Sequence, residues 1–208
     1  MIIRTVVVGP LQVNCHIVGD DQTGRAMVID PGDEPDMIMD AVRKLNLKVE
    51  YIICTHGHFD HVGAVGDIRK DTDAKIVINE SELHVYNSAA EMAHYFGLEF
   101  DQQPEPDVFV DEEDSVSIGN LKFAVLRTPG HSPGGITLYG EGIAVTGDTL
   151  FAGSIGRTDL PGGDEKMMGK SLRRLLSLPG DTKILCGHGP SSTIGREKKD
   201  NPFAGVFR

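Results

Sequence analysis

The chain lacks several features that would assign it to particular classes of protein. It has no tryptophan and only three cysteines, Cys15, Cys54 and Cys186, in 208 residues. Their odd number and wide spacing exclude a disulfide framework and favour reduced thiols in a cytoplasm. No apolar stretch is long enough to span a bilayer, and the N-terminal residues do not have the layout of a signal peptide. We therefore expect a cytoplasmic protein that does not use a membrane as a partner.

Positive charge is also scarce. Twenty Lys and Arg residues against 31 Asp and Glu residues give a formal net charge of −11. Such a surface repels nucleic acid and anionic lipid, so we expect neither as a partner. Hydrophobic residues make up 39% of the chain, which allows a sizeable core and argues against disorder. The length is compatible with one α/β domain spanning residues 1–208.

Strands and helices alternate along the chain. Strands are expected at Ile2–Val8, Val13–Val18, Ala26–Asp30, Val49–Thr55, Lys75–Ile78, Val116–Ile118, Leu121–Arg127, Ile136–Tyr139, Ile143–Val145 and Lys183–Cys186. Helices are expected at Pro35–Leu45, Val62–Lys70, Glu80–Phe96 and Met167–Leu178. The acidic segment Asp101–Asp114 is expected to be a surface loop. This order predicts sheets covered by helices, with loops that converge at the C-terminal ends of the strands.

A dense cluster of metal-binding side chains follows one of these strands. The segment His56-Gly57-His58-Phe59-Asp60-His61 offers four such side chains within six residues. Three more candidates, His131, Asp148 and His188, lie in glycine-bearing turns far downstream. Imidazole nitrogen and carboxylate oxygen are ligands that zinc accepts readily. The seven side chains together are enough for two metal ions in one cleft.

The spacing within the cluster suggests how the side chains are shared. In an extended turn His56 and His58 can face the same side, whereas Asp60 and His61 lie where a helix begins and can face a second ion. Asp148 can place its carboxylate between the two ions. The alternative is a scatter of unrelated structural histidines, but five of the eight histidines fall into this pattern. The remaining three, His16, His84 and His94, are interpreted as structural or solvated.

The motif and its three downstream partners resemble the metallo-β-lactamase superfamily over nearly the whole chain. The resemblance implies a four-layer αββα sandwich with two divalent metal ions at one edge. It implies that one ion is held by His56, His58 and His131, and that the other is held by Asp60, His61 and His188, with Asp148 as the bridge. Zinc is the expected metal, while iron, manganese and occupancy by a single ion stay open.

A narrower resemblance, to the glyoxalase II group, is carried by Gly147–Phe151, by Gly156–Asp159 and by the tail Gly187–Gly195. The tail matches a short bacterial branch that lacks the long C-terminal helical domain. The resemblance implies hydrolysis of S-acyl glutathione thioesters such as S-lactoylglutathione. It places Arg157 where the full-length enzymes carry a basic residue for the glutathione carboxylate. Pairing of Arg157 with Asp159 or Asp164 is an equal alternative.

The expected reaction is cleavage of a thioester by a metal-activated hydroxide, with Asp60 orienting the hydroxide and accepting its proton. A thiolate, with a pKa of about 8.5, leaves without much help from an acid. No dedicated acid for an amine leaving group is obvious, which favours a thioester over an amide. An Fe(II) persulfide dioxygenase and a lactonase of the same superfamily are the alternatives. The dioxygenases usually have alanine at the position of Phe59.

Overall fold

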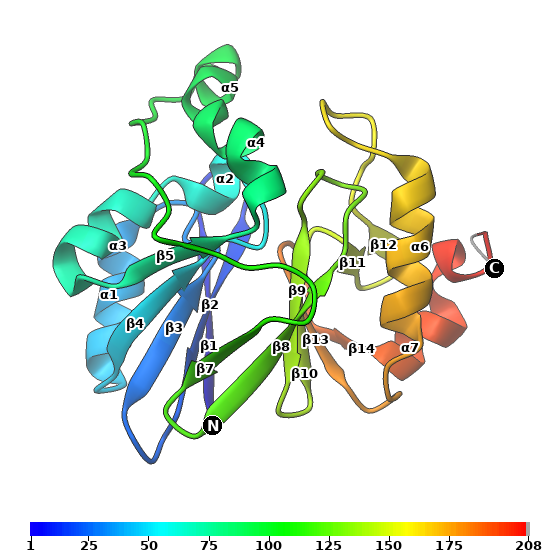
Figure 1. The fold of residues 1–208 in the computed structure, drawn as a ribbon, viewed down its shortest axis with the longest axis horizontal. Coiled ribbons are helices and arrows are strands. Elements are labelled where there is room, and N and C mark those ends of the chain that lie inside the picture. The colour runs from blue at the N-terminus through cyan, green and yellow to red at the C-terminus, as the bar shows by residue number, and fades with distance from the viewer. Residues whose placement is uncertain (207–208) are drawn as a thin grey trace.

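The computed structural model describes residues 1–206, which form two six-stranded sheets packed against each other (Figure 1). The first sheet contains β1 (Ile2–Val8), β2 (Val13–Gly19), β3 (Arg25–Ile29), β4 (Lys48–Ile53), β5 (Lys75–Ile78) and β6 (Val108–Phe109), in that spatial order. The second sheet, in chain order, contains β7 (Ser115–Ile118), β8 (Leu121–Arg127), β9 (Ile136–Gly140), β10 (Ile143–Gly147), β13 (Lys183–Cys186) and β14 (Ser192–Thr193). Its spatial order is β14–β13–β10–β9–β8–β7.

Helices cover the outer faces of both sheets (Figure 1). The first half of the chain supplies α1 (Pro35–Lys44), α2 (Phe59–Val62), α3 (Val65–Thr72), the 3-10 turn η1 (Glu80–Glu82), α4 (Leu83–Asn87) and α5 (Ala89–Tyr95). The second half supplies α6 (Glu165–Leu176), α7 (Ile194–Asp200) and the 3-10 turn η2 (Pro202–Ala204), together with the small ribbon of β11 (Leu150–Phe151) and β12 (Ser154–Ile155). The expected αββα sandwich is confirmed. No helix within residues 1–206 is long and apolar enough to cross a membrane.

Burial explains why each sheet forms one half of the sandwich. Every residue of β2 is buried, and the apolar residues of β3 to β5 alternate between a core beneath the helices and a core between the sheets. In α1 the buried residues Ile38, Met39 and Val42 recur at helical spacing and face the first sheet. Direct hydrogen bonds then join the sheets at one edge. Ile136 N donates to Thr55 O at 2.9 Å, and Asn14 N donates to Gly187 O at 2.7 Å.

Several predicted elements differ from the structure. The helix predicted over Glu80–Phe96 is divided into η1, α4 and α5, because Asn79 caps only the first turn and Ser88 ends α4 and begins α5. The helix predicted from Val62 begins at Val65 and is preceded by the separate turn α2. The acidic segment expected to be only a loop contains β6, whose two residues pair with β5. Local patterns predict none of α7, β11, β12 and β14, which are short or carry few apolar residues.

Candidate metal centre

Loops from both sheets bring the seven predicted side chains to one edge of the sandwich. His56 and His58 follow β4, and Asp60 and His61 lie on α2, which begins directly after them. The other three come from the second sheet, where His131 follows β8, Asp148 follows β10 and His188 follows β13. This is the same edge at which Thr55 and Gly187 join the two sheets by backbone hydrogen bonds.

The first group consists of His56, His58 and His131, whose ligating atoms all lie within 4.8 Å of one another. Nδ1 of His58 lies 2.9 Å from Nε2 of His131. The opposite nitrogen of His131, Nδ1, hydrogen-bonds the carbonyl oxygen of Arg157 at 2.8 Å. This contact fixes the ring so that Nε2 faces the other two histidines, as a hydrogen bond to the remote ring nitrogen does for metal-binding histidines.

The second group consists of Asp60, His61 and His188, and its ligating atoms also lie within 4.8 Å of one another. The Nε2 atoms of His61 and His188 are 3.3 Å apart, and Oδ2 of Asp60 lies 3.4 Å from Nε2 of His188. Nδ1 of His188 hydrogen-bonds the carbonyl oxygen of Leu11 at 3.1 Å. The side chain of His188 is 29% exposed and that of Asp60 is 16% exposed, while that of His61 is fully buried.

Asp148 lies between the two groups. Its Oδ1 atom is 3.5 Å from Nε2 of His61, and its Oδ2 atom is 3.6 Å from Nε2 of His131 and 3.5 Å from Nε2 of His188. A close backbone approach makes this possible, because a Cβ atom on Gly187 would lie 2.1 Å from Oδ1 of Asp148. Any side chain at position 187 would therefore push the carboxylate out of its place.

The electrostatics differ between the groups. Burial, and then the neighbouring His61, lower the pKa of His56 well below its ordinary value. Burial and His131 lower the pKa of His58 to about 4. Burial also acts to lower the pKa of His61, but the charges of Asp148 and Asp60 outweigh it and raise that pKa well above the ordinary value. Burial likewise acts to lower the pKa of His188, but the hydrogen bond to Asp60 and the charges of Asp148 and Asp60 together outweigh it and raise that pKa.

Two atoms at the centre are buried without a hydrogen-bond partner among the described residues, namely Nε2 of His56 and Oδ1 of Asp148. Burying a polar atom without a partner costs roughly 1–3 kcal/mol, so each such atom needs an explanation. A divalent cation would give both atoms a partner. The donor set of imidazoles and carboxylates also suits such an ion. The residues present therefore fit a metal centre.

Sequence reasoning missed Asp30, a fully buried carboxylate beneath the second group. Its Oδ1 atom accepts a hydrogen bond from Thr55 N at 2.7 Å, and Oδ2 accepts one from Thr55 Oγ1 at 2.7 Å. Oδ2 also lies 3.2 Å from Nδ1 of His61. Asp30, His56 and His61 could themselves form a ligand group by distance. Because Thr55 and the ring of His61 already occupy both oxygens, Asp30 is better suited to orienting His61. The Asp30-Pro31-Gly32 turn at the end of a strand was the available signal.

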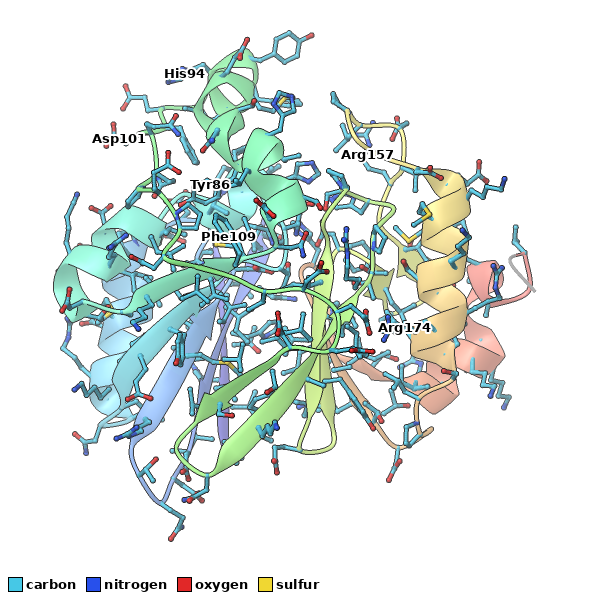
Figure 2. All side chains as sticks on the ribbon, in the orientation of Figure 1. Tyr86, His94, Asp101, Phe109, Arg157 and Arg174 are labelled. Carbon is cyan, nitrogen blue, oxygen red and sulfur yellow. The ribbon has the colours of Figure 1, made fainter. Side chains whose placement is uncertain are left out.

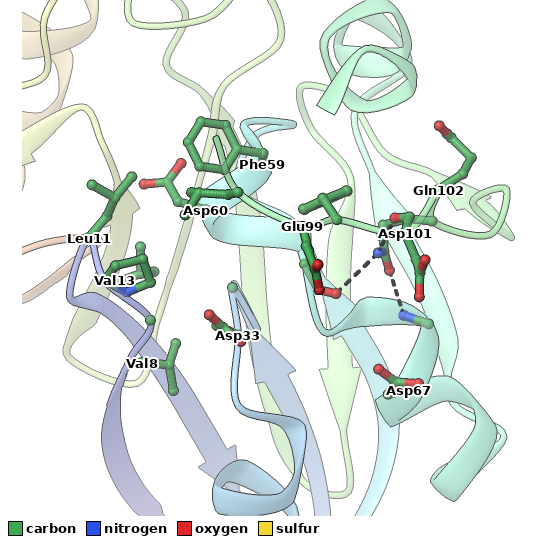
Figure 3. A pocket seen from close by; sticks show the side chains of 18 of the residues that line it. Val8, Leu11, Val13, Asp33, Phe59, Asp60, Asp67, Glu99, Asp101 and Gln102 are labelled. Carbon is green, nitrogen blue, oxygen red and sulfur yellow. Dashed lines mark hydrogen bonds between the residues drawn. The ribbon is translucent and has the colours of Figure 1, made fainter. Parts of the chain in front are cut away.

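A pocket of about 500 Å³ opens beside the second group (Figure 3). Asp60 and Leu11 belong to both the pocket and the surroundings of His188. The remaining walls come from the β1–β2 loop, from α2 and α3, and from residues 98–104. Apolar side chains share these walls with the carboxylates of Asp33, Asp67, Glu99 and Asp101, and with the single ammonium group of Lys70. The pocket is therefore partly apolar and strongly acidic.

Arg157 lies elsewhere, on the loop that leads to α6, on the side of the molecule away from Asp101 (Figure 2). Its guanidinium group donates two hydrogen bonds of 2.7 Å to the carboxylate of Asp159. Both side chains are exposed. The predicted pairing with Asp159 is therefore present, and pairing with Asp164 is not seen among the described contacts. The carbonyl oxygen of Arg157 contacts His131, so this loop also forms part of the centre.

Comparisons with known proteins agree with this arrangement. A family model described as Metallo-beta-lactamase superfamily matches residues 8–188. The hydroxyacylglutathione hydrolase GloC of Haemophilus influenzae is 38% identical over 208 residues, which cover 98% of each chain. A crystal structure of TTHA1623 in a di-iron-bound form has a TM-score of 0.89 at 40% identity and covers 96% of this chain and 99% of that one. ETHE1 from Myxococcus xanthus has a TM-score of 0.83 at 30% identity and covers 99% of this chain and 85% of that one.

Proposed function

Because this chain belongs to the metallo-beta-lactamase superfamily, we propose that it is a metal-dependent hydrolase of thioesters, with S-acyl glutathione of the S-lactoylglutathione type as its substrate. The observation that carries the proposal is the convergence of two three-residue groups on Asp148 at one edge of the sandwich. The similarity to a hydroxyacylglutathione hydrolase over 98% of both chains supports this choice of substrate.

The proposed centre holds two divalent cations. The first group, His56, His58 and His131, would hold one ion, and the second group, Asp60, His61 and His188, would hold the other. Asp148 would contact both. Zinc is the metal that we propose, and the di-iron form of TTHA1623 makes iron the alternative to test. When bound, such ions polarise a carbonyl group and lower the pKa of a water molecule.

Asp60 is the residue that we assign to proton transfer. Burial acts to raise its pKa, but His61 and His188 outweigh burial and lower that pKa. The carboxylate is therefore ionised near neutral pH and can orient a water molecule and accept its proton. Asp60 also lines the pocket, so this proton acceptor faces the space from which a substrate would approach. A thiolate leaving group, with a pKa of about 8.5, then departs without an acid.

The charges around the centre favour one orientation of the substrate. Glutathione carries two carboxylates, which the acidic pocket would repel and the guanidinium group of Arg157 would attract. We propose that the acyl group enters the pocket and that the glutathione portion lies toward Arg157. The three cysteines are buried and unpaired, which is consistent with the reducing cytoplasm where glutathione is abundant.

A second candidate is a persulfide dioxygenase with one Fe(II), favoured by the similarity to ETHE1 at 30% identity. Metal-quantified protein should be tested on S-lactoylglutathione, an aliphatic lactone, a β-lactam and glutathione persulfide. The proposal expects the highest kcat/KM on the thioester and loss of turnover in His58→Ala. Oxygen consumption with the persulfide by protein that contains one iron would replace the thioesterase with the dioxygenase.

A further inference from the structure

Glu82 is a buried acidic residue that the proposed chemistry does not use. It ends the η1 turn, and its side chain is completely buried. Its Oε2 atom accepts a hydrogen bond from Gly57 N at 2.8 Å, and its Oε1 atom accepts one from Gly134 N at 2.5 Å. Gly57 separates His56 from His58, and Gly134 lies in the loop that carries His131. One carboxylate therefore joins the backbones of both loops that form the first group.

The packing around Glu82 is close enough to make this contact specific. A Cβ atom on Gly57 would lie 2.6 Å from Tyr86 N, and a Cβ atom on Gly134 would lie 2.9 Å from Glu82 N. Both loops therefore approach the backbone of η1 and α4 at positions where no side chain fits. The neighbouring Asn79 holds the η1 turn in place, because its side chain accepts a hydrogen bond from Ser81 N at 3.0 Å and donates one to Val110 O at 2.7 Å.

A buried carboxylate is an expensive way to satisfy two backbone donors unless its position matters. Burial raises the pKa of Glu82, and the side chain of Ser132 together with the hydrogen bonds from Gly134 and Gly57 opposes that rise. The two donors lie 25 residues before and 52 residues after Glu82 in sequence, so the contact connects the two halves of the chain. Within residues 1–206, the hydrogen bonds of Glu82 involve no residue of the second group.

We propose that Glu82 is a positioning residue of the metal centre, which sets the separation between the His56–His58 loop and the His131 loop and so tunes metal affinity at the first group alone. This inference rests on the proposed metal centre but not on the identity of the substrate. Partners that orient metal ligands contribute about 10–100-fold to metal affinity. The effect of losing Glu82 should fall in that range and should be confined to one of the two positions.

The test is Glu82→Gln, measured by titration of metal-free protein with Zn²⁺ against a chromophoric chelator. Gln keeps the shape of the side chain but turns one acceptor into an amide group that cannot accept from a backbone N–H. The substitution is placed in two backgrounds. In His188→Ala the second group is incomplete, so binding reports the first group, and in His131→Ala binding reports the second. Glu80→Gln, an exposed residue on the same turn, is the matched control.

We expect Glu82→Gln to weaken Zn²⁺ binding by about 10–100-fold in the His188→Ala background. Binding in the His131→Ala background should stay at the level of that background alone, and Glu80→Gln should change neither. Unchanged affinity in the His188→Ala background would overturn the proposal, and so would an equal loss in both backgrounds. If the Gln variant does not fold, the same titration is carried out on Glu82→Asp. This variant keeps the charge but is one methylene shorter, and we expect the same result. Hydrolase assays do not enter this test, so the proposed activity and the proposed role of Glu82 can fail separately.

Discussion

The first and second groups each have a buried carboxylate beside them, but the two carboxylates contact different parts of the chain. Glu82 accepts hydrogen bonds from the backbone of the loops that carry the first group. Asp30 contacts the imidazole ring of His61 in the second group. The first contact fixes the distance between two loops, whereas the second fixes the orientation and raises the basicity of one ligand. A buried carboxylate can thus support a group of ligands in two ways, by holding the backbone of the loops that carry them or by holding the side chain of one ligand.

The groups also differ in exposure. The side chain of His131 is 8% exposed, while those of Asp60 and His188 are 16% and 29% exposed. The pocket opens beside the second group. We infer that exchange of substrate and water occurs on that side.

Asp148 contacts both groups, so its loss should produce the largest effect and remove the difference between them. We expect Asp148→Ala to lose metal from both positions and to lower kcat/KM on the thioester by more than about 100-fold, the upper range for an orienting partner alone. Metal analysis and steady-state kinetics check this, with circular dichroism to show that the fold persists. A variant that kept one tightly bound ion and most of its activity would contradict a shared role.

Asp30→Asn should affect the second group as Glu82→Gln affects the first. Asn cannot accept at both positions, so either Thr55 or the ring of His61 loses its partner. We expect Zn²⁺ affinity to fall by about 10–100-fold in the His131→Ala background and by less in the His188→Ala background, because Asp30 reaches His56 only through the hydroxyl of Thr55. Asp36→Asn, an exposed carboxylate on α1 that does not line the pocket, is the control. Equal losses in the two backgrounds would show that Asp30 supports the fold as a whole.

The pKa shifts give the two groups different pH dependence. In the metal-free protein the raised pKa values of His61 and His188 favour the protonated rings, which must lose their protons before they can bind a metal. The pKa of His58 is about 4 and that of His56 is also lowered, so these rings are already neutral. As the pH falls, affinity should weaken first at the second group and, for His58, only near pH 4.

Calorimetric titration with Zn²⁺ in buffers of different ionisation enthalpy measures the protons released in each of the two backgrounds. Release at pH 7 should be greater on filling the second group, in His131→Ala, than on filling the first, in His188→Ala. Equal release in the two backgrounds would mean that the asymmetry of charge does not exist in solution.

Arg157 should produce the smallest effect, because its side chain is exposed and already paired with Asp159. We expect Arg157→Gln to raise KM for S-lactoylglutathione by about three- to tenfold with little change in kcat, as loss of a contact made equally in the ground and transition states does. A thioester without carboxylates on its thiol portion should not show the change. Arg43→Gln, which removes an exposed arginine paired with Asp40 on α1, is the control. No change in KM would leave Arg157 with its structural pairing only.

Much of this architecture follows from local patterns in the sequence. Strands such as β1, β5 and β13 have the predicted bounds because clear turn residues end their apolar runs. The motif after β4 can be found because it holds four metal-binding side chains within six residues. Asp30 and Glu82 could not be found in that way. Each is a single carboxylate whose partners lie at least 25 residues away, so only the packed chain shows what it contacts.

Each of the two groups takes ligands from both sheets, since His131 joins two residues of the first sheet and so does His188. A cation held in either place would act as a cross-link between the halves of the sandwich. The mechanical rigidity of the molecule would then depend on metal supply. Under metal starvation a cell would hold loosened chains with their sheet edges more open to proteases, and turnover of the polypeptide would itself report how much metal the cell contains.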